Sequence, residues 1–512
     1  MNVTSFLEHW GLKEHPFRAE EARHDPVFAR LSAGPMAHPD IEKLAGDLHR
    51  PASGVVFGEK GAGKTAMRMQ LEGRIEKHNA DADDGERLFV VRLDDLNGVL
   101  DRFSHAVGIE PGMDDKSIVK KLSKFRLSDH IDAILHGGVS QLCDAILGVG
   151  SPAHGLSSDT ARRLRWGDVR TRSDVMLLAA LYDRSGGERQ RMAAIRRRAR
   201  GPRNGIGFLF WLGVWFGWLP AAALVATFIY MGRPGNVDYW LYGLYALLGL
   251  WGLVLIKCIA VDRTLMARTA RKLSKQLRVT PKRGRALSHS LALVPSSARQ
   301  PESLPFSSEP EIRLDLLRRF LDILRAVGCK GMIVIIDRVD EPALLVGDAA
   351  RMRAVIWPLF SNTLLQVEGL GVKMLLPIEL RHELMRESAS FFQEARLDKQ
   401  SLVERLAWSG AMLYDLCNAR LRACLHNDVK EPGPALTDLF DEAVTRQDLV
   451  DALDQMAQPR DAFKMLYQCL AEHCSNVTEE QAAWRIPRLV LETVRKQQAE
   501  RVQMLHRGLR PA

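Results

Sequence analysis

Four short apolar runs predict the strands of a parallel sheet. They cover residues 54–57, 87–93, 331–336 and 371–376. The run 331–336 is continuously apolar, which is typical of a strand that is buried on both faces. The stretches 87–93 and 371–376 also contain Arg87, Arg92 and Lys373 but fit the same sheet. Helical patterns alternate with these runs, and such alternation predicts an α/β fold with a doubly wound, mostly parallel sheet.

Apolar residues at helical spacing predict helices in most of the remaining chain. Two clear examples are residues 128–146 and residues 311–327. From about Leu402 the pattern predicts helices throughout, forming an all-α C-terminal lid that ends with a helix over 490–509. Residues 288–310 are rich in Ser and Pro and show little periodicity, so we expect a linker there.

Two uncharged stretches are long enough to cross a membrane. Residues 206–230 carry no charged side chain, and a second stretch covers residues 239–261 if Lys257 reaches the interface. Stretches of this length span the roughly 30 Å of a hydrocarbon core. A short turn at 231–238 makes them antiparallel neighbours. The alternative is a hairpin buried in a soluble core, but core helices seldom run so long without a charge.

Charge on either side of the hairpin predicts its orientation. Basic residues flank both stretches, whereas the turn holds Arg233 against Asp238. The positive-inside rule then predicts an integral protein of the inner or cytoplasmic membrane, with both termini and the remaining chain in the cytoplasm. Juxtamembrane Lys and Arg attract anionic lipids, and this explains the flanks without nucleic acid as a partner. The flanking residues are Arg189, Arg191, Arg196, Arg197, Arg198, Arg200, Arg203, Arg263, Arg268, Arg271, Lys272, Lys275, Arg278, Lys282, Arg283 and Arg285.

Composition narrows the class of protein. The 512 residues suffice for roughly two to four domains, and the formal net charge is +9. Its 7 cysteines form no C-x-x-C pair. We therefore expect a reducing compartment rather than a disulfide framework or a zinc site. Residues 1–4 do not begin a basic stretch followed by a long apolar run, so we expect no signal peptide.

A glycine-rich loop follows the first predicted strand and opens a helical pattern. It matches G-x-x-x-x-G-K-[ST], a motif that binds phosphates in this context. Its backbone N–H groups approach the phosphates, and the helix N-terminus adds a favourable dipole. Lys64 would contact the β- and γ-phosphates and assist catalysis, and the Thr65 hydroxyl would contact Mg²⁺. The predicted binding residues are Gly58, Glu59, Lys60, Gly61, Ala62, Gly63, Lys64 and Thr65.

An aspartate ends the apolar run 331–336, where a triphosphatase needs an acid for its metal ion. Asp337 would hold Mg²⁺, through water. Asp340 or Glu341, with Glu341 favoured, would orient or deprotonate the attacking water, unless both only cap the next helix. Ligands bind beyond the carboxyl ends of parallel strands, which places Glu379 near the phosphates as well.

The order of these motifs resembles one family of nucleotide-binding proteins. No N-K-x-D motif lies downstream of the glycine loop and no D-x-x-G motif follows the acidic strand, so a small GTPase is disfavoured and ATP follows by elimination. The glycine loop (58–65) and the acidic strand (332–337) flank the predicted hairpin. This looks like the KAP family of P-loop NTPases, related to STAND and NACHT ATPases, which carry transmembrane helices between the Walker A and Walker B motifs.

The second motif carries the same resemblance. Residues 335–341, Ile-Ile-Asp-Arg-Val-Asp-Glu, match the family's D-x-h-D-E form, in which h is apolar. The resemblance implies that Asp337 is the magnesium aspartate and that Asp340 and Glu341 form the acidic pair. It covers residues 50–95 and 310–400, and the lid more loosely.

Two narrower resemblances point to related ATPases. Residues 10–17, Trp-Gly-Leu-Lys-Glu-His-Pro-Phe, are similar to the opening of ExeA-type secretion ATPases. Residues 458–461, Gln-Pro-Arg-Asp, resemble the P-R motif in the lids of AAA+ and ORC-like proteins. That resemblance implies that Arg460 reaches the nucleotide as a sensor. An ordinary structural salt bridge is the alternative for Arg460, and it is the favoured role for Arg381.

The expected organisation places the hairpin inside the nucleotide-binding core. The expected divisions are a lead-in (1–50), the first part of the core (51–95), a helical insertion (96–200), the hairpin (201–262), a basic helix with linker (263–309), the second part of the core (310–400), and the lid with C-terminal helices (401–512).

We therefore expect a membrane-anchored ATPase that uses ATP and Mg²⁺ to drive a conformational switch or an assembly with a protein partner. The alternatives are an oligomeric AAA+-like motor, a secretion or envelope assembly ATPase, and a DNA-handling ATPase. A motor would be a homo-oligomer with a trans-acting arginine, for which no motif supports Arg351, Arg353 or Arg396. A transporter is disfavoured because neither residues 206–230 nor residues 239–256 contain an acid or base.

Overall fold

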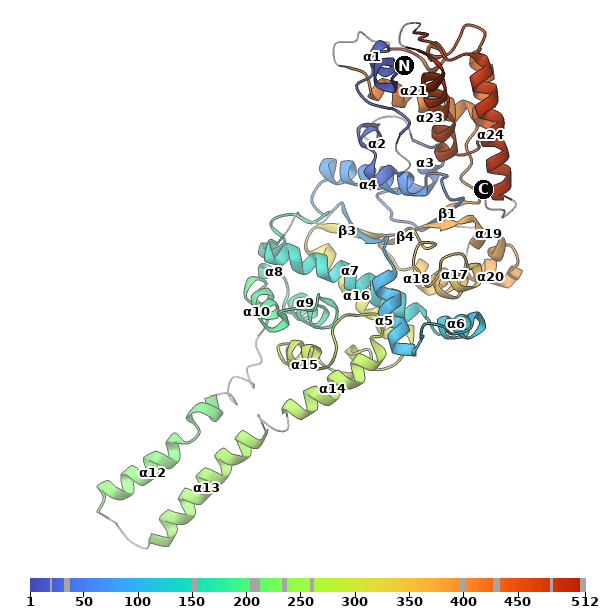
Figure 1. Ribbon diagram of the computed structural model, residues 1–512. Helices are drawn as coiled ribbons and strands as arrows, with labels where there is room; N and C mark the ends of the chain where they lie inside the picture. The colour runs from blue at the N-terminus through green and yellow to red at the C-terminus, as the bar shows by residue number, and fades with distance from the viewer. Residues whose placement is uncertain are drawn as a thin grey trace.

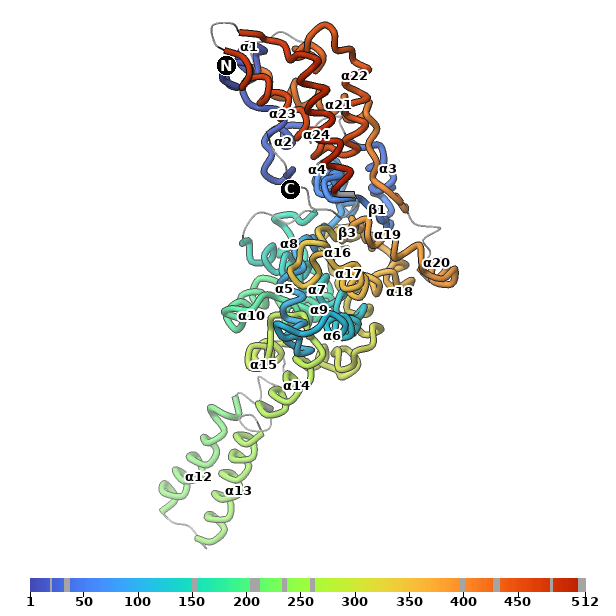
Figure 2. Tube along the Cα trace, turned by 45° about the vertical axis from the view of Figure 1, so that its right-hand side comes forward, coloured from blue at the N-terminus to red at the C-terminus, as the bar shows by residue number. Residues whose placement is uncertain are grey.

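A sheet covered by helices separates a helical lid from a projecting helical hairpin (Figure 1). Figure 2 shows the same arrangement from a second direction. The computed structural model describes residues 1–18, 21–31, 37–149, 155–202, 212–232, 237–257, 262–395, 401–426, 433–478 and 482–506.

Five parallel strands form the sheet, in the order β2-β3-β4-β1-β5. The α/β class and the four predicted strands are confirmed. The prediction of helix from Leu402 onward is wrong at its start, because Leu402 pairs with Val55 of β1. Three residues are too few to show a strand period, so this edge strand depends on its neighbour. The strands are β1 (Gly54–Gly58), β2 (Arg87–Leu93), β3 (Cys329–Ile336), β4 (Leu370–Pro377) and β5 (Ser401–Val403).

Alternate strand residues face two apolar layers. Val56 packs in a layer with residues of α3 (Asp40–Ala45) and α4 (Lys64–Asp81). Phe57 packs in the opposite layer with residues of α7 (Leu127–Leu147) and α16 (Pro310–Ala326), which confirm two predicted helices. Further helices on that side are α5 (Asn97–Val107), α6 (Asp115–Leu122), α8 (Thr160–Trp166), α9 (Val169–Tyr182), α10 (Glu188–Arg198), α17 (Ala349–Ile356), α18 (Asn362–Leu365), α19 (Ile378–Leu384) and α20 (Ala389–Glu394).

The predicted linker at 288–310 is wrong. α15 (Gly284–Ala292) enters this stretch, and two short 3-10 turns follow it. Leu291, Val294 and Leu304 are buried in the same apolar layer as α7 and α16. A few apolar residues among many Ser and Pro residues give no period, yet tertiary packing orders the segment.

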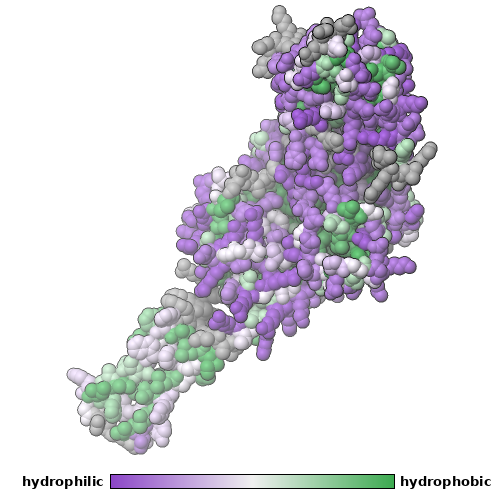
Figure 3. Space-filling model, viewed as in Figure 1, coloured by the Kyte–Doolittle hydropathy of each residue, from purple (hydrophilic) through white to green (hydrophobic). Residues whose placement is uncertain are grey.

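Two apolar helices form the hairpin. One covers Leu212–Tyr230 and contains α12 (Leu219–Tyr230); the other is α13 (Val237–Leu255). Both are long and apolar enough to cross a membrane, and very little of either is buried in the protein. Figure 3 shows their apolar surface projecting from a more hydrophilic body. A hairpin buried in a soluble core, the alternative interpretation, is therefore excluded for these residues.

The hairpin helices pack as antiparallel neighbours. Trp251 Nε1 donates a hydrogen bond to the Val214 carbonyl (3.3 Å), and Phe228 contacts Trp240 near the other end. The first helix is interrupted by a turn just before Pro220, whose ring nitrogen cannot donate a helical hydrogen bond. Several predicted parts of the hairpin region lie outside the described residues: 206–211, 233–236 and 258–261, with Arg203 and Arg233.

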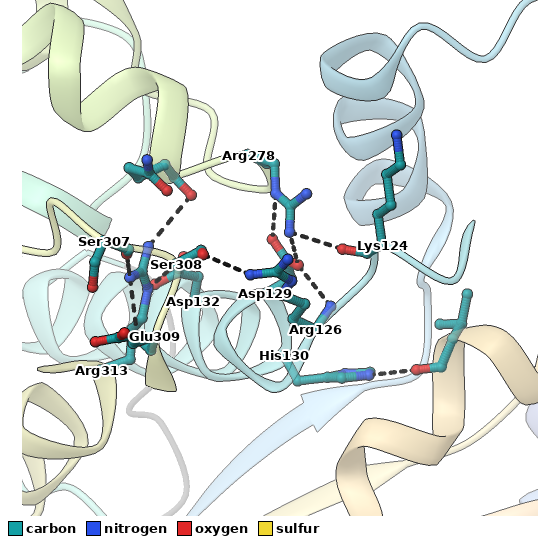
Figure 4. A network of polar contacts seen from close by, with 12 residues as sticks. Lys124, Arg126, Asp129, His130, Asp132, Arg278, Ser307, Ser308, Glu309 and Arg313 are labelled. Atoms are coloured by element: carbon teal, nitrogen blue, oxygen red, sulfur yellow. Dashed lines mark hydrogen bonds and ion pairs between the residues drawn. The ribbon is translucent and has the colours of Figure 1, made fainter. Parts of the chain in front are cut away.

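A network of charges, most of them buried, lies at the end of α14 (Asp262–Gln276), the helix that follows the hairpin (Figure 4). α14 leads from the hairpin to Arg278, which pairs with Asp129 of α7. Arg313 of α16 pairs with Asp132 (3.5 Å), and both side chains are completely buried. Arg313 Nη2 also donates to the Gln276 carbonyl (3.4 Å) at the end of α14. These contacts join the end of α14 to α7 and α16, two helices that cover the sheet.

The two ends of the chain share the core of the lid. Phe6 and Phe17 pack in the same apolar cluster as the C-terminal helices. Figures 1 and 2 both place α1 (Val3–His9) against α23 (Pro459–Asn476). The lead-in also contains α2 (Pro26–Leu31), and the lid contains α21 (Gly410–Ala423), α22 (Arg446–Asp454) and α24 (Arg488–His506), which confirms the predicted last helix.

A buried lysine fastens α3 to the sheet. Lys373 of β4 is 1% exposed, and its ammonium donates to the carbonyls of Leu44 (2.6 Å) and Ala45 (3.0 Å). These carbonyls end α3, where a cation is favourable. Burial lowers the pKa of Lys373 to about 8.

We expect a pH-dependent contribution of Lys373 to stability. Between this pKa of about 8 and the ordinary 10.5, the unfolded chain keeps the proton that the folded chain has released. Raising the pH through this window therefore favours folding. The free energy of unfolding of the wild type, relative to Lys373→Met, should increase from about pH 8 to about pH 10 in denaturant titrations. A difference that stays constant over this window would contradict the expectation.

Candidate functional site

A cavity of about 470 Å³ lies where the sheet meets the lid. The glycine loop and the segment after β3 form one wall, the lead-in forms a second, and α21 and α23 form a third. This volume lies in the range of small-molecule sites, roughly 300–1,000 Å³. The cavity thus brings together the lead-in, the glycine loop, the segment after β3 and the lid.

The glycine loop turns the chain from β1 into α4. Gly61 (φ 103°) and Gly63 (φ 94°) have left-handed backbones that favour glycine. Gly63 is the N-cap of α4, so the helix N-terminus lies at the cavity wall. A side chain at Gly61 would also collide with Gln458, since its Cβ would lie 2.8 Å from Gln458 Oε1.

Lys64 lies almost buried beside this loop. Its ammonium donates to the carbonyls of Gly58 (2.7 Å) and Glu59 (3.1 Å). Burial lowers the pKa of Lys64, and the carboxyl groups of Asp340, Asp337 and Glu379 oppose this shift in that order. The structure therefore gathers the predicted acids around the predicted lysine.

Asp337 and Thr65 meet across the cavity floor. The Thr65 hydroxyl donates to Asp337 Oδ2 (3.2 Å), although 272 residues separate the two positions. Asp337 is 1% exposed, and burial raises its pKa. Arg338, which follows it, has a left-handed backbone (φ 60°), and its N–H donates to Asp337 Oδ1 (2.9 Å). A strained residue thus fixes the direction of this carboxylate.

Arg68 is a site residue that the sequence did not reveal. Its Nε lies 3.2 Å from Asp337 Oδ2, and its Nη1 lies 2.9 Å from Glu72 Oε1. Arg68 follows Lys64 by four residues and so lies on the same face of α4. The four-residue spacing from Lys64 could have indicated Arg68 as a site residue, but Asp337, the partner of Arg68, is distant in the chain.

The two acids after Asp337 do not cap a helix. The next helix, α17, begins at Ala349 and is capped by Asp348, so the capping alternative is wrong. Glu341 forms an ion pair with Arg338, whereas Asp340 acts most strongly of the three acids on the Lys64 pKa. Both residues line the cavity.

The lid contacts the glycine loop directly. Glu59 Oε1 pairs with Arg405 (2.7 Å), and its other oxygen accepts from Gln458. Trp408 Nε1 donates to the Ala62 carbonyl (2.9 Å). Arg460 also lines the cavity, and its Nε is buried with no hydrogen-bond partner among the described residues. The sensor role of Arg460 stays a prediction.

The remaining arginine candidates are paired at other places. Arg381 pairs with Glu404 (2.9 Å), the surface role that the sequence favoured. Arg351 pairs with Asp348 (3.1 Å), and Arg353 contacts Glu383 (3.4 Å). Arg396 lies outside the described residues.

We expect Glu59→Gln to loosen the lid. The substitution removes the charge that holds Arg405, while the loop backbone stays intact. Amide hydrogen exchange over residues 405–410 and 458–463 should become about two- to fivefold faster, as expected for the loss of one partly exposed ion pair.

The matched control is Glu42→Gln. Glu42 is an exposed residue of α3 that pairs with Arg74 of α4. Equal exchange rates in the wild type and Glu59→Gln would show that these contacts do not hold the lid.

The oxygen atoms present fit Mg²⁺ that is brought in with phosphate. Within the described parts of the chain, no group of three or more His, Cys, Asp or Glu could hold a metal. Thr65 and Asp337 supply one hydroxyl and one carboxylate. Mg²⁺ typically takes only one or two protein ligands and completes its octahedron with water and substrate phosphates.

Comparisons with known proteins add no relative. No protein-family model, curated protein or solved structure matches the chain.

Proposed function

We propose that this cavity binds ATP with Mg²⁺ and hydrolyses it, and that the resulting movement of the lid is used at a membrane. One observation carries the proposal: the glycine loop, the helix N-terminus, Lys64 and the Thr65–Asp337 pair converge on one cavity. The resemblance to KAP-type P-loop NTPases supports the same activity, because the two motifs flank the hairpin in the order typical of that family.

Each group has a defined task in this proposal. The backbone of residues 58–65 and the α4 N-terminus hold the phosphates. Lys64 would move its ammonium from the loop carbonyls to the β- and γ-phosphate oxygens, and bound Mg²⁺ would neutralise developing charge there. Asp340, or in its place Glu341, would orient the attacking water.

The contacts of the lid favour a conformational switch. Glu59 and Ala62 of the loop bind Arg405, Trp408 and Gln458 of the lid region, so a change in the loop reaches the lid without an intermediate element. A motor would instead show a turnover rate that rises steeply with protein concentration.

The direct test is binding of Mg-ATP and Mg-tripolyphosphate to the detergent-solubilised chain by calorimetry, together with phosphate release. We expect binding of both ligands, and slow turnover that is independent of protein concentration. If neither ligand binds, the proposed site is refuted. A steep dependence on protein concentration would favour the oligomeric motor.

The proposed membrane orientation has its own test. The hairpin turn would lie outside, and the body would lie in the cytoplasm with its basic flanks against anionic lipids. The six described cysteines are buried, so on a Cys258→Ser background an added thiol can be labelled selectively.

We expect Gly232→Cys to react with an impermeant maleimide in intact cells and Ser297→Cys to react only after permeabilisation. Labelling of Ser297→Cys from outside would reverse the orientation.

A further inference from the structure

A buried ion pair closes the far end of the cavity. Asp25 of the lead-in and Arg420 of α21 both line it, and their atoms lie 2.6 Å apart with side-chain exposures of only 4% and 2%. Arg420 Nε donates to the Pro16 carbonyl (2.7 Å). Arg420 Nη2 is buried but has no hydrogen-bond partner within the described residues. A buried guanidinium with an unused donor is rare, because an unpaired polar group is costly.

Arg420 lies at a distance from the glycine loop, on the other side of Arg460. Arg460 packs near Gly61 of the glycine loop, and Phe463 lies three residues later on α23, about one helical turn away. The Arg420 guanidinium lies 4.5 Å from the centre of the Phe463 ring. Arg420 thus lies beyond Arg460 on the side of the cavity away from the loop, where a nucleoside extends when its phosphates occupy the loop.

The surroundings of Arg420 suit a neutral, partly apolar group. Phe28 of α2, Leu416 of α21 and Phe463 also line the cavity. The Asp25 carboxylate neutralises the guanidinium and would repel a phosphate. The unused donor therefore fits an uncharged acceptor, such as a base nitrogen, a base carbonyl or a sugar oxygen.

We propose that Arg420 donates a hydrogen bond to the nucleoside part of the ligand, between the lead-in and the lid, with Phe28 and Phe463 enclosing the base. This inference rests on the proposed function and deepens it, because it assigns nucleoside recognition to residues outside every sequence motif. It also makes the lead-in part of the ligand site, since Asp25 orients Arg420.

The test compares two ligands on one variant. Arg420→Lys keeps a cation beside Asp25 but removes the Nη2 donor. We expect the Kd for Mg-ATP to rise about tenfold, as for one lost hydrogen bond to a charged donor, and the Kd for Mg-tripolyphosphate to stay unchanged. Arg422→Lys is the matched control, because Arg422 is exposed on the same helix.

The outcomes separate this inference from the proposed function. Equal weakening of both ligands, or no change in either, would overturn the role of Arg420. If the wild type binds tripolyphosphate as tightly as ATP, the phosphate site stands and the nucleoside site fails. Binding of neither ligand refutes both. If Arg420→Lys does not fold, Phe463→Leu decides: it must weaken ATP and leave tripolyphosphate unchanged, and any other result overturns the proposal.

Discussion

Replacing Lys64 by alanine should lower the rate of ATP hydrolysis by about 100-fold or more, because the variant loses the ammonium that faces the developing charge. The cation lies in a nearly buried position next to Asp337 and Asp340, where little water can replace it. Phosphate release under saturating Mg-ATP measures the effect, and calorimetry of the same sample separates binding from turnover.

Lys77→Ala is the matched control for this variant, since Lys77 is an exposed lysine on the same helix. Lys64 also donates to two loop carbonyls, so the thermal midpoint of Lys64→Ala must be measured alongside its activity. A folded Lys64→Ala variant that hydrolyses ATP at the wild-type rate would remove the glycine loop from the proposed mechanism.

Arg313→Met should lower the free energy of unfolding by about 3–5 kcal/mol, because it leaves a buried carboxylate without its cation. Asp132 would retain one hydrogen bond from the Tyr182 hydroxyl (2.8 Å), which cannot neutralise a charge. Burial already raises the pKa of Asp132, and Arg313 opposes that shift. Denaturant titration followed by tryptophan fluorescence measures the loss.

Arg318→Met is the control on the same helix, because Arg318 forms an exposed pair with Asp315. Exposed pairs contribute about 0–1 kcal/mol, so this variant should stay close to the wild type. Equal stability of Arg313→Met and Arg318→Met would mean that the buried Arg313–Asp132 pair does not stabilise the packing of α16 on α7.

The central strands could be predicted because burial on both faces leaves a direct mark on the sequence. Ile335 lies in a run without polar interruption, since its strand contributes residues to the apolar layers on both faces of the sheet. The hairpin could also be predicted from the sequence, because its helices are apolar along almost their whole length and very little of either is buried in the described chain. The Ser- and Pro-rich stretch that contains Val294 left no such mark, although this residue is buried.

The candidate site was predicted only in part, and the reason is the range of its contacts. Lys64 and Thr65 belong to a local motif whose glycines and helix start lie within eight residues of each other. Arg68 and Arg420 carry no motif, because each acquires its role from a partner hundreds of residues away. No local spacing encodes such a pair.

Local chemistry along the chain was sufficient to determine four of the five parallel strands, the glycine loop, the acidic end of β3 and the apolar hairpin. Periodicity, glycine backbone freedom and the absence of charge act over a few neighbouring residues. Tertiary structure decided which distant groups share a cavity: it brought Asp337 to Thr65, folded the lead-in into the lid and placed Asp25 against Arg420. These choices follow from long-range packing and from the need of buried charges for partners, which the linear order of residues does not specify.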